Sequence, residues 1–285
     1  MSLTSFIKIP EVKALFKKEF PLSKISLQGE MKAVPVTKNY PLVGTAFDYL
    51  FRFYLENENP NCITKPWVAE HSLAKLETAI EEYGKKAPKD MLNASKKMKL
   101  FLYDAKNAHN DYMKSGDISD DLIKSSVILA QMDILFRSGR IHPSMGNVES
   151  GDVQDLRNLI SIVNPEIFKA KKTCFLNPTF GEGSQLVGGA DADLIVDDIL
   201  VDVKTTKFLS FTQEQYNQLI GYYILSKIGK VNESEDIPIS KFGIYFSRHG
   251  ILHTISAKEI EEHPNFPKFM SVFEKLANSV FDKSK

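Results

Sequence analysis

The stretch Gly188-Gly-Ala-Asp-Ala-Asp-Leu-Ile-Val-Asp-Asp-Ile-Leu-Val-Asp-Val-Lys-Thr-Thr206 predicts a β-hairpin near the middle of this chain. Apolar and polar residues alternate in the first part of the run 190–196 and in the last part of the run 199–205, and both runs are apolar next to the turn. The polar pair Asp197-Asp198 separates the two runs and is typical of a turn, although neither residue is glycine. We therefore predict two antiparallel strands that are joined by a two-residue turn.

The predicted register places the charged residues of the hairpin on one face. Asp193 lies opposite Asp202, and Asp191 lies opposite Lys204. Because side chains alternate between the two faces of a strand, these four side chains project from the same face. The other face carries apolar side chains: Ala192, Leu194, Val196, Ile199, Val201 and Val203. We expect the apolar face to pack on a core and the charged face to border a cleft or solvent.

The grouped carboxylates predict a divalent-metal site. Mg²⁺ and Mn²⁺ prefer carboxylate and carbonyl oxygens, and Mg²⁺ keeps several waters that can attack a phosphate. A bound cation would offset the repulsion between the carboxylates, and the Lys204 ammonium would orient the attacking water or stabilise charge on the phosphate. In the alternative interpretation, the hairpin is a solvated acidic surface and Lys204 is an ordinary ion-pair partner.

The hairpin resembles the signature of the PD-(D/E)XK nuclease superfamily: an Asp near the start of one strand, then Asp or Glu, any residue and Lys on the next. Farther along, Gln218 and Tyr222 lie four residues apart in a predicted helix that starts at Thr212, so they share a helix face. Asp-x-Lys-Thr followed by Gln-xxx-Tyr is similar to the RecB-like branch. The resemblance implies that both side chains support the site or the DNA strand, whereas the alternative places Tyr222 in the core and Gln218 on the surface.

A third similarity lies upstream, in an amphipathic helix predicted over 43–56. Gly44-xxx-Asp48 is similar to the RecB-like Gly-xxx-His helix, with Asp48 in the position of His. An aspartate can bind a metal but cannot act as a neutral imidazole ligand. Asp48 is therefore a candidate acid on the first helix, and Glu56 is an alternative source of the first acid.

The resemblance implies a metal-dependent nuclease that hydrolyses phosphodiester bonds with a Mg²⁺-activated water. Its candidate ligands for Mg²⁺ or Mn²⁺ are Asp193, Asp191, Asp202 and the Val203 carbonyl. The branch's Gly-xx-Asp spacing favours Asp191 as the first ligand, whereas opposition to Asp202 favours Asp193, and both are retained. Lys204 would act on the water or on the phosphate charge.

The expected substrate is DNA, with RNA left open. A different class of function is a non-catalytic module that keeps the nuclease-like fold and binds nucleic acid or a protein partner. A third is a nuclease subunit that works with a helicase or another protein. The sequence is compatible with exonuclease or endonuclease action and with any oligomeric state.

The order of predicted elements indicates an α/β fold, a restriction-endonuclease-like αβββαβ core with a large helical insertion. We expect one nuclease-like domain over 1–285, with the helical insertion over 60–165 and the core sheet and motif helix over 171–256. Helices are predicted over 11–20, 67–83, 90–114, 119–136 and 152–163, and from 258 or 266 onward. Strands are predicted over 173–179, 186–196, 199–207, 242–247 and 251–256.

Composition limits the kinds of partner that the chain can attract. Its 285 residues contain 36 basic and 36 acidic side chains, so no net charge draws it to nucleic acid. DNA contact would depend on local lysine clusters, for which the candidates are Lys96, Lys97, Lys171 and Lys172. Two cysteines without a CxxC pattern argue against structural zinc and disulfides, and they exclude the iron–sulfur cluster of some related nucleases. The absence of a long apolar run or leader-like segment predicts a cytoplasmic protein without a membrane span.

Overall fold

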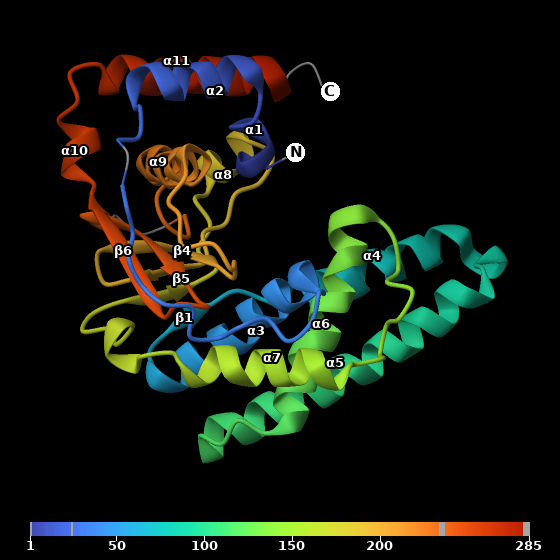
Figure 1. The fold of residues 1–285 in the computed structure, drawn as a ribbon. Helices are drawn as coiled ribbons and strands as arrows, with labels where there is room; N and C mark the ends of the chain where they lie inside the picture. The colour runs from blue at the N-terminus through green and yellow to red at the C-terminus, as the bar shows by residue number, and fades with distance from the viewer. Residues whose placement is uncertain (1, 24, 234–236, 282–285) are drawn as a thin grey trace.

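A six-stranded mixed sheet lies at the centre of the structure, a computed structural model that describes residues 2–23, 25–233 and 237–281 (Figure 1). The strands are neighbours in chain order: β1 (Ile63–Thr64), β2 (Cys174–Leu176), β3 (Leu194–Val196), β4 (Ile199–Lys204), β5 (Lys241–Phe246) and β6 (Ile251–Ser256). β2, β3 and β4 form an antiparallel meander, and β5 and β6 form an antiparallel pair. β1 is parallel to β2, and β4 is parallel to β5.

Helices cover both faces of this sheet (Figure 1). The described chain forms α1 (Leu3–Phe6), α2 (Pro10–Glu19), α3 (Tyr40–Glu58), α4 (Val68–Tyr83), α5 (Lys89–Ser115), α6 (Asp120–Ser138), α7 (Ser150–Ser161), α8 (Glu182–Leu186), α9 (Gln213–Gly229), α10 (Lys258–Glu261) and α11 (Phe266–Phe281). α3 begins three residues before its predicted start because Pro41 is compatible with the first turn of a helix. None of the helices in the described ranges is both long and apolar enough to cross a membrane.

The strand alternation explains why the sheet separates two cores. In β4, Val201 packs with α3 and the helices that follow it, whereas its neighbour Leu200 packs with α2, α9 and α11. In β3, Leu194 packs in the same core as Val201, and Ile195 packs in the same core as Leu200. The face that was expected to border a cleft or solvent is therefore apolar and buried along most of its length. The end of the hairpin that carries Asp193, Asp202 and Lys204 opens to a cleft.

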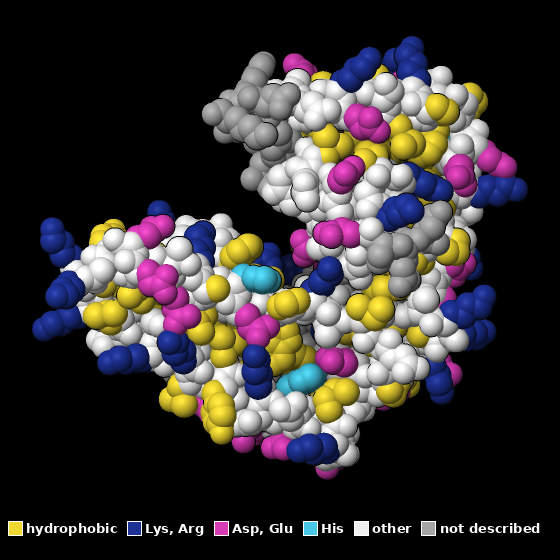
Figure 2. Space-filling model, turned by 180° about the vertical axis from the view of Figure 1, so that it is seen from behind, with side chains coloured by type: hydrophobic (Ala, Val, Ile, Leu, Met, Phe, Trp, Pro, Cys, Tyr) yellow, Lys and Arg dark blue, Asp and Glu magenta, His cyan; other side chains and the backbone are white. Residues whose placement is uncertain are grey.

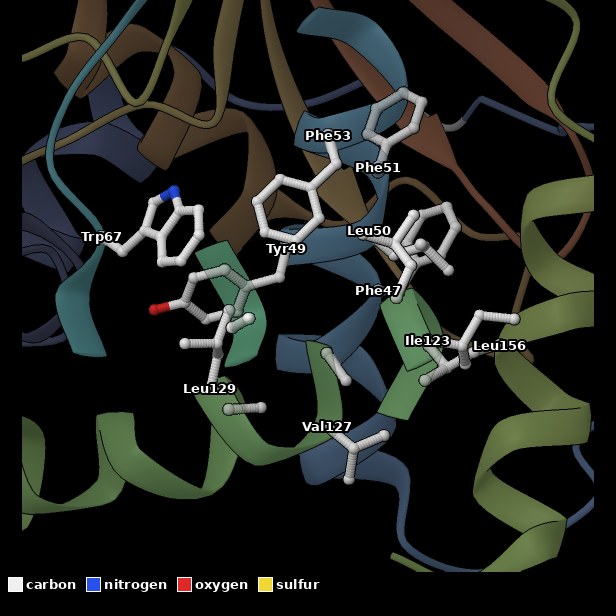
Figure 3. Close-up of a cluster of buried hydrophobic side chains, with 14 of the residues drawn as sticks. Phe47, Tyr49, Leu50, Phe51, Phe53, Trp67, Ile123, Val127, Leu129 and Leu156 are labelled. Atoms are coloured by element: carbon white, nitrogen blue, oxygen red, sulfur yellow. The ribbon is translucent and has the colours of Figure 1, made fainter. Parts of the chain in front are cut away.

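α3 supplies the centre of one core. Its phenylalanines Phe47 and Phe51 are buried and stacked, with ring centroids 5.4 Å apart. Figure 3 shows Leu50 and Phe47 facing side chains of α6 and α7, such as Ile123. This packing places the α3 N-terminus beside the sheet.

The helices inserted between β1 and β2 form a unit that we call the helical block, α4 to α7 over residues 68–161. The range predicted for the insertion, 60–165, also contains β1, which joins the sheet beside β2. This pairing brings Cys62 next to Cys174. Both thiols are free, and a hydrogen bond from one to the other raises the pKa of Cys62.

The strand predicted over 186–196 is wrong in its first part. The sequence before β3 instead contains α8 and an irregular segment. Gly188 and Gly189 have φ angles of 71° and 129°, which are incompatible with an extended strand. Asp191 retains one antiparallel bridge to Thr179, so the chain enters the hairpin without a continuous ladder.

Candidate active site

The hairpin has the predicted two-residue turn. Val196 pairs with Ile199, and Leu194 pairs with Val201. The same register continues to Asp193 and Asp202, one position beyond the ladder. Because the turn has an even number of residues, both aspartates lie on the face of the sheet that α9 covers. Asp193 lies two residues from Ile195, and Asp202 lies two residues from Leu200, and both of these side chains pack in the core with α9.

A cleft of about 440 Å³ opens at this end of the hairpin. Figure 2 shows the molecule hollowed between the helical block and the layer that contains α2 and α11. Thr4 of α1 and Arg137 of α6 line the cleft from different helices. The cleft also brings together these residues that the sequence singled out: Asp48, Asp191, Asp193, Asp202, Val203, Lys204, Gln218 and Tyr222.

Buried Asp202 forms an ion pair with half-buried Lys204 at the floor of the cleft. Only 2% of Asp202 is exposed, and its Oδ2 lies 2.7 Å from Nζ of Lys204. Within the described residues this oxygen makes no hydrogen bond of regular geometry, so the ammonium is its one close partner. Burial raises the pKa of Asp202, and the charge of Lys204 opposes that increase.

Asp193 lies directly beside this pair. Its Oδ2 accepts a hydrogen bond of 2.5 Å from the backbone N–H of Val203. Burial raises its pKa well above the usual range, and the charge of Asp202 adds to the increase. The two carboxylates are thus close enough to repel each other, which is the condition that a shared proton or cation relieves.

Val203 presents its backbone to the same place. In a strand, the N–H and C=O of one residue point to the same side, and the Val203 N–H points to Asp193. β3 has already ended at this level, so the Val203 carbonyl faces the cleft rather than a neighbouring strand. The carbonyl is therefore available as an oxygen ligand.

Lys204 is held in its charged form. Burial alone would lower its pKa, but the negative charges of Asp202 and Asp193 raise it. A lysine that keeps its proton cannot accept one from water. Lys204 can therefore offer a fixed positive charge to a group that enters the cleft.

Gln218 and Tyr222 of α9 extend this polar network. Nζ of Lys204 donates to Oε1 of Gln218 at 3.3 Å, and Nε2 of Gln218 donates to the Tyr222 hydroxyl at 2.9 Å. Since the hydroxyl oxygen already accepts, its hydrogen points elsewhere, and no described residue accepts it. Tyr222 can therefore donate a hydrogen bond to a group that enters the cleft.

Asp48 and Asp191 lie higher in the cleft. Asp48 accepts a hydrogen bond of 2.9 Å from Nη2 of Arg52, which is buried beneath it. Asp191 is exposed by surface area, yet the cleft walls desolvate its carboxyl and raise its pKa, and Asp48 adds to the increase. The alternative first acid, Glu56, is paired with His109 at 3.1 Å and does not line the cleft.

The lysines that were candidates for nucleic-acid binding do not line this cleft. Lys96 and Lys97 are exposed on α5 in the helical block. Lys171 and Lys172 lie at the turn end of the hairpin, where their backbone N–H groups donate to the carboxylate of Asp197. Burial would raise the pKa of Asp197, but these hydrogen bonds lower it. The backbone of these two lysines thus fixes the turn, and nucleic-acid binding by their side chains stays a prediction.

Sequence reasoning did not place Arg137 or Asn177 at the site, although both line the cleft. Arg137 projects its exposed guanidinium from α6, 3.8 Å from Asp133. No local signal could have identified it, because it is remote in sequence from the hairpin. Asn177 lies beside Asp193, whose carbonyl accepts its N–H at 2.9 Å, and the φ of Asn177 is 51°. The Asn-Pro dipeptide is the signal that marks this tight turn.

The donor set agrees with Mg²⁺ or Mn²⁺ in part. In the described residues, no three Asp, Glu, His or Cys side chains converge closely enough to hold a metal ion. The buried Oδ2 of Asp202 lacks a hydrogen bond, however, and Asp193 and the Val203 carbonyl are adjacent oxygens. Mg²⁺ is commonly held by one or two carboxylates with waters and substrate phosphate. Asp193 and Asp202 fit that smaller requirement.

Neither a scan against models of protein families nor searches of curated proteins and solved structures give a match to this chain. The function is therefore inferred from the cleft itself.

Proposed function

We propose that this protein is a divalent-metal-dependent nuclease that hydrolyses phosphodiester bonds in DNA. The observation that carries the proposal is the convergence of Asp193, Asp202 and Lys204 from one hairpin with Gln218 and Tyr222 from α9 in one cleft. The element order α3, β2, β3, β4, α9, β5 also agrees with the restriction-endonuclease-like core expected from the sequence. This core and the RecB-like assignment are part of the proposal.

In this proposal Asp193, Asp202 and the Val203 carbonyl hold Mg²⁺ or Mn²⁺. The bound ion supplies a water of lowered pKa and offsets negative charge on the phosphate. The buried Oδ2 of Asp202 has the Lys204 ammonium as its close partner and no hydrogen bond of regular geometry, and Asp193 is pre-oriented by the Val203 N–H. Asp191, at the cleft wall, is the candidate for an outer contact through water.

Lys204 stabilises the charge that develops on the phosphate oxygens. Its ammonium is fixed between Asp202 and Gln218, so little reorganisation is needed when the substrate enters. The Tyr222 hydroxyl adds a second donor, because its hydrogen is not used within the described chain. Both groups act from the α9 side of the hairpin.

Among the described residues no third acid converges closely with Asp193 and Asp202, which favours one alternative, a non-catalytic module that binds nucleic acid or a protein partner. Such a module would keep the ion pair of Asp202 and Lys204 as a structural feature. The experiment below separates the two functions.

The test is cleavage of single- and double-stranded DNA and RNA by the purified chain with Mg²⁺, Mn²⁺ or EDTA. We expect cleavage with either metal and none with EDTA. Asp202→Asn should lower the rate about 100-fold. Asp198→Asn is the matched control, because Asp198 belongs to the turn of the same hairpin and does not line the cleft. Binding without cleavage by the wild type would support the non-catalytic module, and equal cleavage by Asp202→Asn would contradict the proposed site.

A further inference from the structure

A second cavity, of about 170 Å³, adjoins the candidate active site and shares Tyr40 and Thr205 with it. Its other lining residues include Lys207 and Phe208, which follow β4 in the chain. None of these side chains has a part in the hydrolysis proposed above. The cavity thus continues the cleft along the surface.

Two aromatic rings and one ammonium group lie together at this cavity, and we call them the platform: Tyr40, Lys207 and Phe208. Tyr40 is 43% exposed and Phe208 is 64% exposed. Nζ of Lys207 lies 5.9 Å from the centroid of the Tyr40 ring and 5.3 Å from that of Phe208. Rings so exposed bury little apolar surface, so they contribute little to the stability of the fold.

We propose that the platform binds unpaired bases, so that the substrate of the adjacent cleft is single-stranded nucleic acid. This inference rests on the proposed function and specifies its substrate class. Aromatic rings stack on the face of any base, and each such contact contributes about 1–3 kcal/mol. The bases of a duplex are already stacked on one another and cannot reach Tyr40 or Phe208, so a duplex would offer only its backbone.

The position of the platform relative to Lys204 suits a continuous strand. Lys207 follows Lys204 by three residues, which span at most about 10 Å of extended chain. That distance corresponds to roughly three stacked nucleotides at about 3.4 Å each. A strand whose phosphate lies on Lys204 can therefore place a nearby base on the platform.

The local charges also fit a nucleic-acid strand. The chain has no net charge, so phosphate attraction must come from particular side chains. Lys207 supplies a cation between the two rings, and Arg137, with 62% of its side chain exposed, supplies another on the far wall of the cleft. Arg137 lines the cleft itself, and Lys207 lines the cavity that adjoins it, so each space has a cation for phosphate.

The platform is tested by fluorescence anisotropy with a labelled single-stranded oligonucleotide and the blunt duplex of the same sequence. EDTA is present, so binding is measured without cleavage. We expect Tyr40→Ala and Phe208→Ala each to weaken single-strand binding about 5- to 100-fold and to leave duplex binding unchanged. Tyr103→Ala is the matched control, because Tyr103 is 65% exposed on α5 and lies outside both cavities.

A direct readout comes from Phe208→Trp, which places an indole on the platform. The natural Trp67 is buried, with 9% exposed, so it contributes a separate background. Stacking of a base should quench the fluorescence of the new indole on addition of single strands but not of duplex. Absence of this quenching, together with unchanged anisotropy for Tyr40→Ala and Phe208→Ala, would overturn the platform.

The two proposals fail in different ways. DNA cleavage with Mg²⁺ but normal single-strand binding by the platform variants would overturn the platform alone. Single-strand binding that depends on both rings, without any cleavage by the wild type, would overturn the nuclease alone. Sedimentation of the chain at several concentrations adds a last check: a dimer that Phe208→Ala disrupts would assign the rings to self-association and overturn the platform.

Discussion

At the scale of single residues, burial turns ordinary charged side chains into a coupled network. Asp202 is enclosed with Lys204 as its partner, and Gln218 holds the ammonium from the other side. Hydrogen bonds in such a network are directional, so the orientation of one amide sets the direction of the next hydroxyl. Gln218 uses its oxygen for Lys204 and its nitrogen for Tyr222.

This directionality gives a prediction for Tyr222→Phe. The variant loses one hydroxyl, so its free energy of unfolding should fall by about 1 kcal/mol or less. Its cleavage rate should fall about 10-fold, since the donor to the substrate is removed. Urea denaturation and a cleavage assay measure the two effects. Tyr216→Phe on the same helix is the control, because Tyr216 does not line the cleft; equal rates in both variants would make the Tyr222 hydroxyl dispensable.

At the scale of elements, α9 must lie close to two neighbours in order to present its polar face to the hairpin. On one side it packs over β4, and on the other it contacts α8. Gly183 of α8 permits the second contact, because an added Cβ would lie 2.5 Å from the backbone oxygen of Leu225 in α9. A backbone atom cannot move away as a flexible side chain would.

Gly183→Ala should therefore reduce the free energy of unfolding by about 1–3 kcal/mol, the usual cost of overpacking. The control is Gln185→Ala, an exposed position on the same short helix, which should change stability little. Thermal unfolding followed by circular dichroism compares the two. A Gly183→Ala variant as stable as Gln185→Ala would show that α8 can shift without cost.

The contact between α3 and α6 depends on a buried carboxyl. The Tyr49 hydroxyl donates to Asp133 at 2.6 Å and accepts from the Ala69 N–H. Burial raises the pKa of Asp133 to about 7, although the Tyr49 hydrogen bond and Arg137 oppose the increase. The folded chain thus binds this proton more tightly than the unfolded chain, in which the pKa is about 3.9.

The contribution of Asp133 to stability should fall as pH rises from about 4 to about 7 and then stay constant. Asp133→Asn lacks this titration. Its free energy of unfolding relative to the wild type should therefore increase between pH 5 and pH 8, by at most about 3 kcal/mol. Urea denaturation at both pH values measures the difference. Asp121→Asn, exposed on the same helix, should show no such trend, and a pH-independent difference for Asp133→Asn would refute the titration.

At the scale of the whole molecule, one buried ion pair links the sheet to the helical block. Arg248 follows β5 and makes two hydrogen bonds to Asp155 of α7, at 2.7 and 3.1 Å. It also donates to the Ala33 carbonyl at 3.2 Å. Both charged side chains are at most 1% exposed, so each depends on the other for compensation.

Asp155→Ala should lower the free energy of unfolding by about 3–5 kcal/mol, because it leaves a buried guanidinium without its partner. The double variant Asp155→Leu/Arg248→Met should recover most of that loss, since it buries no charge. Urea denaturation of the three chains provides the comparison. If the double variant were as unstable as Asp155→Ala, packing rather than the unpaired charge would explain the loss.

Local pattern by itself predicted much of this protein. Alternation with period two located the hairpin and the pair β5 and β6, and helical periodicity located α3, α9 and the helical block. The even turn at Asp197-Asp198 followed from the same alternation, and with it the shared face of Asp193 and Asp202. These features depend on residues that are close in sequence, so a local pattern is enough to predict them.

Tertiary structure alone decided which distant residues meet. The start predicted for β3 was wrong, because packing of α8 on α9 and the positive φ angles of Gly188 and Gly189 override the extended pattern. Arg137 reaches the cleft through the packing of α6, and Tyr40 reaches Lys207 through the position of α3. Such contacts join segments that are distant in sequence. Whether they form depends on the entropy of loop closure and on packing in the core, and local periodicity contains no information on either.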